Sequence, residues 1–392
     1  MGPAVSRSAS CQVPWKCYFD PLPLRELDLF TGRIAPWEME SRQRIQSLDQ
    51  FRGYTVAAMF VVNFLGGFAS VPAILRHHNT YCSYADIVMP HFFFAVGFAL
   101  RLVLLKEIER HGAAAAYKRG LKRGISLFIF GIFFYQLDGN YRAWSELKEL
   151  GVQGFFSESF RRSSFQALTH IGVTSLWVLP VITRSIRTRI LFLLGSAILH
   201  VVVSHLFWYD TLQTWRVIDG GLLGFLSWAV PTLAGSFAYD WIQRSTSDSL
   251  KPMAIWGTVL MIVGYAISCL SQGGQLAAPP FFPPNTEVDL WTMSQRAGSV
   301  SYLTFAAGFS LALYVVFVWC CDMRGRTLSL FTDIGANAFA AYVIHMIALN
   351  AFERFGPKDA PLWYAVLFML LGCWISLVMV RWCNRRNLYL RL

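Results

Sequence analysis

The chain has 392 residues, of which 55% are hydrophobic and only 15% are charged. Soluble domains carry roughly 25% charged residues, so this composition, with a mean hydropathy of +0.43, excludes a soluble single-core protein, a disordered chain and a coiled coil. The net charge of +11 fits a membrane protein whose Lys and Arg lie in cytoplasmic loops, and we expect no nucleic-acid partner.

Ten stretches approach the roughly 20 predominantly apolar residues that a membrane-spanning helix needs. They are far longer than the ~10-residue strands of a membrane barrel. The first stretch contains no charged residue and gives the clearest pattern. The sequence therefore predicts an all-α polytopic membrane protein in the lipid bilayer, with about ten transmembrane helices over residues 54–75, 87–105, 124–137, 165–183, 190–209, 220–239, 252–270, 297–321, 334–352 and 360–380.

The remaining segments are predicted to be tails and loops. Residues 1–44 are rich in Pro and in mixed charge, and we expect a flexible cytoplasmic tail there. A transmembrane domain follows at 45–382, and residues 383–392 are a basic cytoplasmic C-terminal tail. We expect a short amphipathic helix in the loop 138–164, and the Pro-rich loop 271–296 is predicted to cover part of the protein.

The orientation of the chain follows from the distribution of its basic residues. If the N-terminus is cytoplasmic, the loops on that side carry roughly twice as many Lys and Arg residues as the opposite loops. Both termini are therefore predicted to lie in the cytoplasm. The eight cysteines form no C-x-x-C pair and no cluster with metal-ligand spacing, so we expect no metal ion.

Several predicted spans contain polar or ionisable residues, which are costly in a membrane and usually face the interior of a bundle. At 1.5 Å per residue, Asn63 and His345 lie at similar depths, roughly 16 and 18 Å from the cytoplasmic side. Some of these groups are therefore expected to meet near the midplane. The set comprises Asn63, His91, His170, His200, His205, Asn337, Tyr342 and His345.

An external turn next to this set carries two adjacent histidines, His77 and His78, followed by Asp86. A histidine with a near-neutral pKa can act as a general base or a nucleophile. A carboxylate behind it can orient the ring. The turn is therefore a candidate catalytic element.

The chain resembles the transmembrane acetyltransferases related to heparan-α-glucosaminide N-acetyltransferase, as a divergent, bacterial-type homologue without a large luminal domain. The resemblance covers roughly residues 44–382. Its motifs are Ser47-Leu48-Asp49-x-Phe51-Arg52-Gly53, Val62-Asn63, Ala85-Asp86 with Pro90 and Phe92, Asp219-Gly220-Gly221-Leu222-Leu223, Phe282-Pro283-Pro284-Asn285, Leu290-Trp291-Thr292, and Gly335-x-Asn337 with Tyr342 and His345.

The resemblance implies transfer of an acetyl group from cytosolic acetyl-CoA, a co-substrate, to an extracytoplasmic amino sugar or glycan. His78 is the implied catalytic histidine, with His77 as the alternative and Asp86 as its support. The implied membrane is the bacterial inner membrane, or a lysosomal-type membrane in a eukaryote, and a homodimer is compatible with the family. The residues expected to bind the cofactor are Asp49, Arg52, Asn63, Arg123, Asn337, Tyr342 and His345.

Two other functions remain open from the residues alone. A small-solute transporter or channel would use the same set of polar residues within the spans, although the sequence shows no internal repeat of the kind common in transporters. A catalytically inactive membrane homologue is the second alternative. Turnover of acetyl-CoA separates the acyltransferase from both.

Overall fold

The computed structural model describes residues 45–78, 80–135, 143–162, 165–214, 218–270, 276–284 and 287–390, except for the side chains of residues 147 and 155–162. The predicted tail at 1–44, Asn79 and parts of both long predicted loops lie outside these residues. All described residues belong to one unit, residues 45–392.

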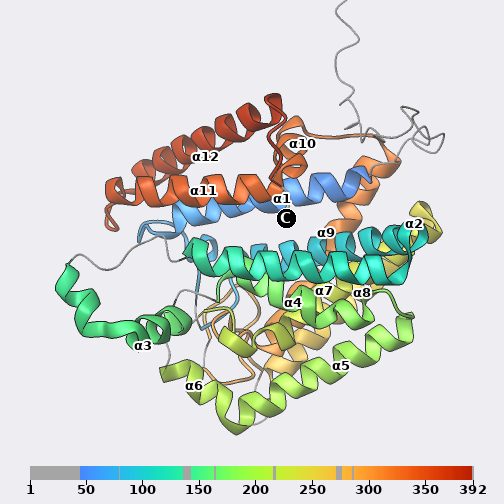
Figure 1. Ribbon diagram of the computed structural model, residues 1–392, viewed down its shortest axis with the longest axis horizontal. Helices are drawn as coiled ribbons and strands as arrows, with labels where there is room; N and C mark the ends of the chain where they lie inside the picture. The colour runs from blue at the N-terminus through green and yellow to red at the C-terminus, as the bar shows by residue number, and fades with distance from the viewer. Residues whose placement is uncertain are drawn as a thin grey trace, which may run out of the picture. The chain divides into compact units, whose positions relative to one another are not determined.

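Every regular element in the described part of the chain is helical, which confirms the predicted all-α class. The loop 138–164 contains a helix, α3, with a bend at Gly151. The helices, in chain order, are α1 (Gln46–Gly66), α2 (Tyr84–Tyr135), α3 (Trp144–Arg162), α4 (Ala167–Ile182), α5 (Ile186–Val203), α6 (Tyr209–Thr214), α7 (Phe225–Arg244), α8 (Thr246–Ser268), α9 (Val300–Phe317), α10 (Ser329–Ala336), α11 (Ala338–Phe352) and α12 (Leu362–Arg385) (Figure 1).

Length and apolar composition support several membrane crossings. Six helical segments among the described residues are long and apolar enough to span a membrane, or seven if α10 and α11 together make one broken span. These segments confirm an integral, multi-pass membrane protein. They do not confirm the predicted count of ten.

The first helix differs from the predicted span 54–75, because α1 starts at Gln46 and ends at Gly66. Its charged first turn is stabilised from another part of the chain. The Ser47 backbone N–H donates to the Asp322 carboxylate at 2.9 Å, and the Ser47 hydroxyl lies 2.9 Å from the Tyr314 hydroxyl. An acceptor at a helix start satisfies a backbone donor that has no partner within the helix.

The long helix α2 is a hairpin with two arms. The Arg119 guanidinium lies 2.6 Å from the Glu107 carboxylate, whereas twelve residues of continuous helix would separate them by about 18 Å. The chain reverses at Gly112, whose φ of +82° is readily adopted only by glycine. The first arm contains the predicted span 87–105, and the second arm ends at Tyr135, within the predicted span 124–137.

The predicted span 334–352 is wrong as a single straight helix. Its residues belong to α10 and α11, which are bent by 93° at Asn337. The Asn337 side chain donates to the Leu388 carbonyl at 2.8 Å and accepts from the Leu390 N–H at 3.3 Å. These bonds tie the break to the segment that follows α12.

The first arm of α2 runs parallel to α7 and in close contact with it. Phe93 packs against Trp228 near the starts of the two helices, with ring centroids 4.4 Å apart, and Arg101 binds Asp240 towards the end of α7 at 2.5 Å. The backbones of the two helices pack directly against each other at Gly235. A side chain would not fit there, because a Cβ on Gly235 would lie 1.9 Å from the Phe94 carbonyl oxygen. Both helices therefore begin at the same end of the bundle, which we call the histidine end because His77 precedes α2 there.

Loops that are distant in sequence meet at the histidine end. The Ala69 N–H donates to the Lys358 carbonyl at 2.8 Å, and the Phe281 N–H donates to the Cys82 carbonyl at 2.9 Å. The Gly220 N–H donates to the Arg296 carbonyl at 2.9 Å. Four of these residues lie in loops that the charge count assigns to the extracytoplasmic side, and Ala69 and Gly220 lie near the corresponding ends of predicted spans.

This assignment predicts a labelling pattern in intact cells. A cysteine at Leu276, which is 72% exposed, should react with a membrane-impermeant thiol reagent before lysis. A cysteine at the exposed Ser247, in the first turn of α8, should react only after lysis, because it lies in a loop predicted to be cytoplasmic. The opposite pattern would refute the orientation.

Candidate active site

The site is built around the pair of His77 and Asp86. Asp86 lies in the first turn of α2 and is fully buried. One carboxylate oxygen is 2.9 Å from His77 Nδ1, and the other accepts from the Ser83 N–H and hydroxyl, both at 2.9 Å. The carboxylate is therefore fixed, while 42% of the His77 side chain stays exposed.

A chain of hydrogen bonds continues from His77 into the bundle. His77 Nε2 lies 3.3 Å from the Asn63 Oδ1 of α1, and Asn63 Nδ2 lies 3.0 Å from the His345 Nε2 of α11. His345 Nδ1 lies 2.7 Å from the Tyr342 carbonyl, which can only accept. Because that carbonyl can only accept, His345 accepts from Asn63, and the Asn63 Oδ1 is left to accept from His77 Nε2 when His77 is protonated.

This arrangement fits a positively charged imidazole. Burial lowers the pKa of His77, but the hydrogen bond and the charge of Asp86 outweigh it, with smaller contributions from Asp219 and Gln295, so that the pKa of His77 is raised overall. The protein therefore stabilises the form of His77 that exists after it accepts a proton.

His78, the histidine favoured from sequence, has a different environment. Its Nε2 donates to the Ala73 carbonyl at 2.7 Å, and its ring stacks on Tyr81 with centroids 4.2 Å apart. Only its backbone N–H faces Asp86, at 3.4 Å from each carboxylate oxygen. The carboxylate thus binds the side chain of His77 and the backbone of His78.

Two tyrosines extend the network beyond His345. The Tyr342 hydroxyl is 2.7 Å from the Tyr135 hydroxyl at the end of α2, which accepts from the Leu168 N–H at 2.8 Å. His345 itself stacks on Phe60 of α1, with centroids 5.0 Å apart. Polar residues from α1, α2 and α11 therefore form one connected group at the histidine end.

A comparison with protein families identifies the class of the chain. Residues 45–381 match Acyl_transf_3, described as an acyltransferase domain. The chain belongs to this acyltransferase family. A comparison with curated proteins found no match. The histidine network thus lies within the matched acyltransferase domain.

Other predicted cofactor-binding residues of this acyltransferase lie apart from the network. Asp49 and Arg52 are 3.8 Å from each other in the first turns of α1. The guanidinium groups of Arg52 and Arg123 are close enough to repel each other. Asn337 is bonded to the C-terminal segment. The predicted cofactor set therefore divides, with Asn63, Tyr342 and His345 beside His77 and the other members elsewhere.

Sequence reasoning assigned no site role to Asp219 and Gln295. Asp219 is 2% exposed and accepts a hydrogen bond from Gln295 Nε2 at 2.8 Å, and both residues act to raise the pKa of His77. Asp219 does belong to a motif that carries the family resemblance. For Gln295, the sequence gives no signal beyond its place in the Pro-rich loop.

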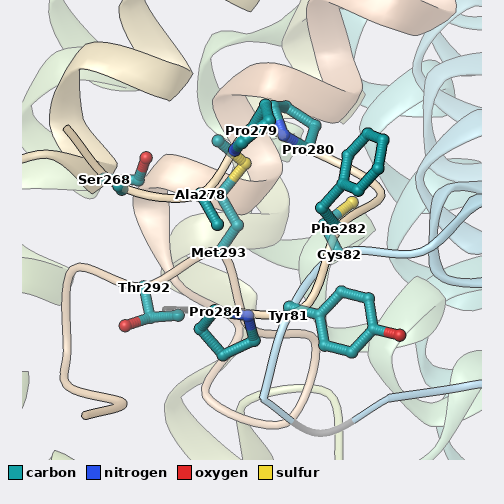
Figure 2. Close-up of a pocket in the computed structure, with 11 residues that line it drawn as sticks. Tyr81, Cys82, Ser268, Ala278, Pro279, Pro280, Phe282, Pro284, Thr292 and Met293 are labelled. Carbon is teal, nitrogen blue, oxygen red and sulfur yellow. The ribbon is translucent and has the colours of Figure 1, made fainter. Parts of the chain in front are cut away.

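Two hollows flank the histidine turn. One, of about 380 Å³, lies between Tyr81 and Cys82 on one side and the Pro-rich loop on the other, with Pro279, Phe282 and Met293 in its wall (Figure 2). Burial raises the pKa of Cys82, so its thiol is a poor nucleophile. The second hollow, of about 520 Å³, is lined by Thr80, Tyr209, Leu212, Gln213, Val288, Ser294, Arg296 and Ala297.

Proposed function

We propose that this acyltransferase uses acetyl-CoA from the cytosol to acetylate an amino sugar or glycan on the other side of the membrane. In this respect it would act like the family of heparan-α-glucosaminide N-acetyltransferase. The observation that carries the proposal is the chain of hydrogen bonds Asp86–His77–Asn63–His345. It supplies a supported base and polar hydrogen-bond donors at one place.

In the proposed reaction, His77 takes the proton that the acceptor must lose before it attacks. The attacking nitrogen or oxygen forms a bond to the acetyl carbon, the carbon–sulfur bond breaks, and CoA leaves as the thiolate, which takes up the second proton that an amine acceptor loses as the amide forms. One N–H of the Asn63 amide is used by His345, and its second N–H can donate to the thioester oxygen as negative charge develops there.

The donor is proposed to enter from the opposite end of α1. Arg52 and Arg123 carry positive charge there, and arginine is well suited to binding phosphate groups such as those of CoA. The histidine end then receives the acceptor. This division of roles accounts for the separation of the predicted cofactor residues.

The test is a transfer assay with the purified protein in liposomes. Radiolabelled acetyl-CoA is supplied on one side and a panel of amino sugars and glycans on the other, and acetylated product is measured on the acceptor side. Product that requires the protein supports the proposal. Movement of an unmodified solute without product would favour a transporter, and absence of both would favour an inactive homologue.

A further inference from the structure

The second arm of α2 presents an exposed face that changes in character along its length. The residues of this face follow one another at intervals of four, three, four and four, which places them on one side of a helix. Gly120, Gly124 and Leu127 on the opposite side are buried. In chain order the exposed residues are Lys118, Lys122, Ile125, Ile129 and Phe133. Lipid covers the apolar part of this face, so the two lysines lie where the arm leaves the bilayer.

Helix α5 repeats this arrangement. Five of its exposed residues follow one another at the same intervals, and Arg189 and His200 on the opposite side are buried. The exposed residues, in chain order, are Arg187, Leu191, Leu194, Ile198 and Val202. A single cation therefore precedes a lipid-facing apolar stripe on α5, as the two lysines do on α2.

The basic ends of the two faces meet at one corner of the bundle, opposite the histidine end. The Tyr117 hydroxyl of α2 lies 2.9 Å from the Thr183 hydroxyl in the loop before α5, and the Tyr117 ring packs in one apolar cluster with residues of α4 and α5. Arg101 donates to the carbonyls of residues 182 and 184, at 2.5 and 3.4 Å, which fixes the loop. We call the exposed cations beside this contact the cationic corner; they are Lys118, Lys122, Arg184 and Arg187.

The cationic corner lacks a counter-charge from the protein. Its four members form no ion pair with any residue that the structure describes, whereas Arg119 beside them binds Glu107 at 2.6 Å. Arg123 follows Lys122 directly, but one residue turns a helix by roughly 100°, and its guanidinium lies near that of Arg52. The arginines that we assign to CoA and the cations of the corner therefore face different directions.

We infer that the cationic corner binds the phosphate headgroup of an anionic phospholipid, whose acyl chains lie against the apolar stripes of α2 and α5. Anionic lipids attract juxtamembrane Lys and Arg residues, by about fivefold in affinity for each cation. A second copy of the chain fits this surface less well, because a symmetric contact would bring like charges together. The bound lipid joins α2 to the start of α5 and should stabilise the fold. This inference is independent of the proposed transfer reaction.

The test is the thermal midpoint of the purified full chain in mixed micelles. Phosphatidylglycerol should raise the midpoint more than phosphatidylcholine with the same acyl chains does. The difference should shrink as salt is added, because exposed charges are screened. Inorganic phosphate and CoA, at matched ionic strength, should not displace the effect of phosphatidylglycerol.

The decisive variant removes one cation from each helix, as Lys118→Gln with Arg187→Gln. Its apparent affinity for phosphatidylglycerol should fall about 25-fold, or fivefold for each cation, while its response to phosphatidylcholine stays the same. The matched control, Arg326→Gln with Arg386→Gln, removes two exposed cations from other segments and should keep the native affinity. If the double variant does not fold, Lys122→Gln alone should weaken the affinity about fivefold.

Three results would overturn the inference. An equal loss of phosphatidylglycerol affinity in the corner variant and in the control would mean that the lipid responds to total charge. Competition by CoA or inorganic phosphate would assign the corner to a soluble ligand. A change of oligomeric state in the corner variant, with unchanged lipid affinity, would assign this surface to a contact between copies of the chain.

Discussion

Replacing His77 by alanine should reduce acetyl transfer about 10²–10⁴-fold, the usual effect of losing a general base. The reason is that His77 is the histidine whose ring is bonded to the fixed carboxylate of Asp86 and to Asn63. The measurement is the initial rate of acetylated product at saturating acetyl-CoA. Affinity for acetyl-CoA should change little, because the donor is proposed to bind mainly at the other end of α1.

Two further variants control for structure. His77→Gln can still donate a hydrogen bond to Asp86 but cannot act as a base near neutral pH, so it should be as inactive as His77→Ala. His78→Ala should retain activity within about tenfold, because the ring contacts only Ala73 and Tyr81 among the described contacts and adds no acid–base step. If His78→Ala is the inactive variant, the base has been assigned to the wrong histidine.

The helical architecture could be predicted because membrane-spanning helices have a strong sequence pattern. The regular rise of a helix also allowed the depth of polar residues in the membrane to be estimated from the sequence. Asn63 and His345 were expected at similar heights, and their side chains lie 3.0 Å apart. A constant rise per residue applies only where the chain is continuously helical, which holds for Asn63 within α1, whereas the count for His345 crosses the bend at Asn337.

The choice between His77 and His78 could not be made in the same way, because these residues lie in an irregular turn. Their side chains follow no fixed period, and spacing along the sequence does not say which ring reaches Asp86. The bend at Asn337 was missed for a related reason, since its cause is a contact with Leu388 and Leu390. Contacts between segments far apart in the chain leave no local pattern.

A buried cluster of charged residues at the end of the bundle opposite the histidine end also could not be predicted from the sequence. Asp240 of α7 binds Arg101 of α2 at 2.5 Å and also binds Arg189 of α5. Arg101 donates to the Ile182 carbonyl at 2.5 Å, and Arg189 donates to the Ser236 hydroxyl at 2.7 Å. The cluster thus joins the first arm of α2 and the ends of α4 and α7 to the start of α5.

Asp240→Ala should therefore destabilise the protein strongly. Arg189 is fully buried, and the Arg101 side chain is only 10% exposed, so loss of the carboxylate leaves two positive charges close together with no counter-charge. Breaking a buried ion pair by removing one partner costs about 3–5 kcal/mol. The thermal midpoint in detergent, followed by the monodisperse fraction after heating, should fall on the order of 10 °C.

The matched control removes an exposed ion pair from the same protein. Arg119 binds Glu107 at 2.6 Å, and its side chain is 62% exposed, so Arg119→Ala should cost only about 0–1 kcal/mol. The double variant Asp240→Ala with Arg189→Met should recover part of the lost stability, because it removes one of the uncompensated charges and fills the space with an apolar chain. Equal midpoints for Asp240→Ala and Arg119→Ala would mean that water, and not the protein, neutralises this cluster.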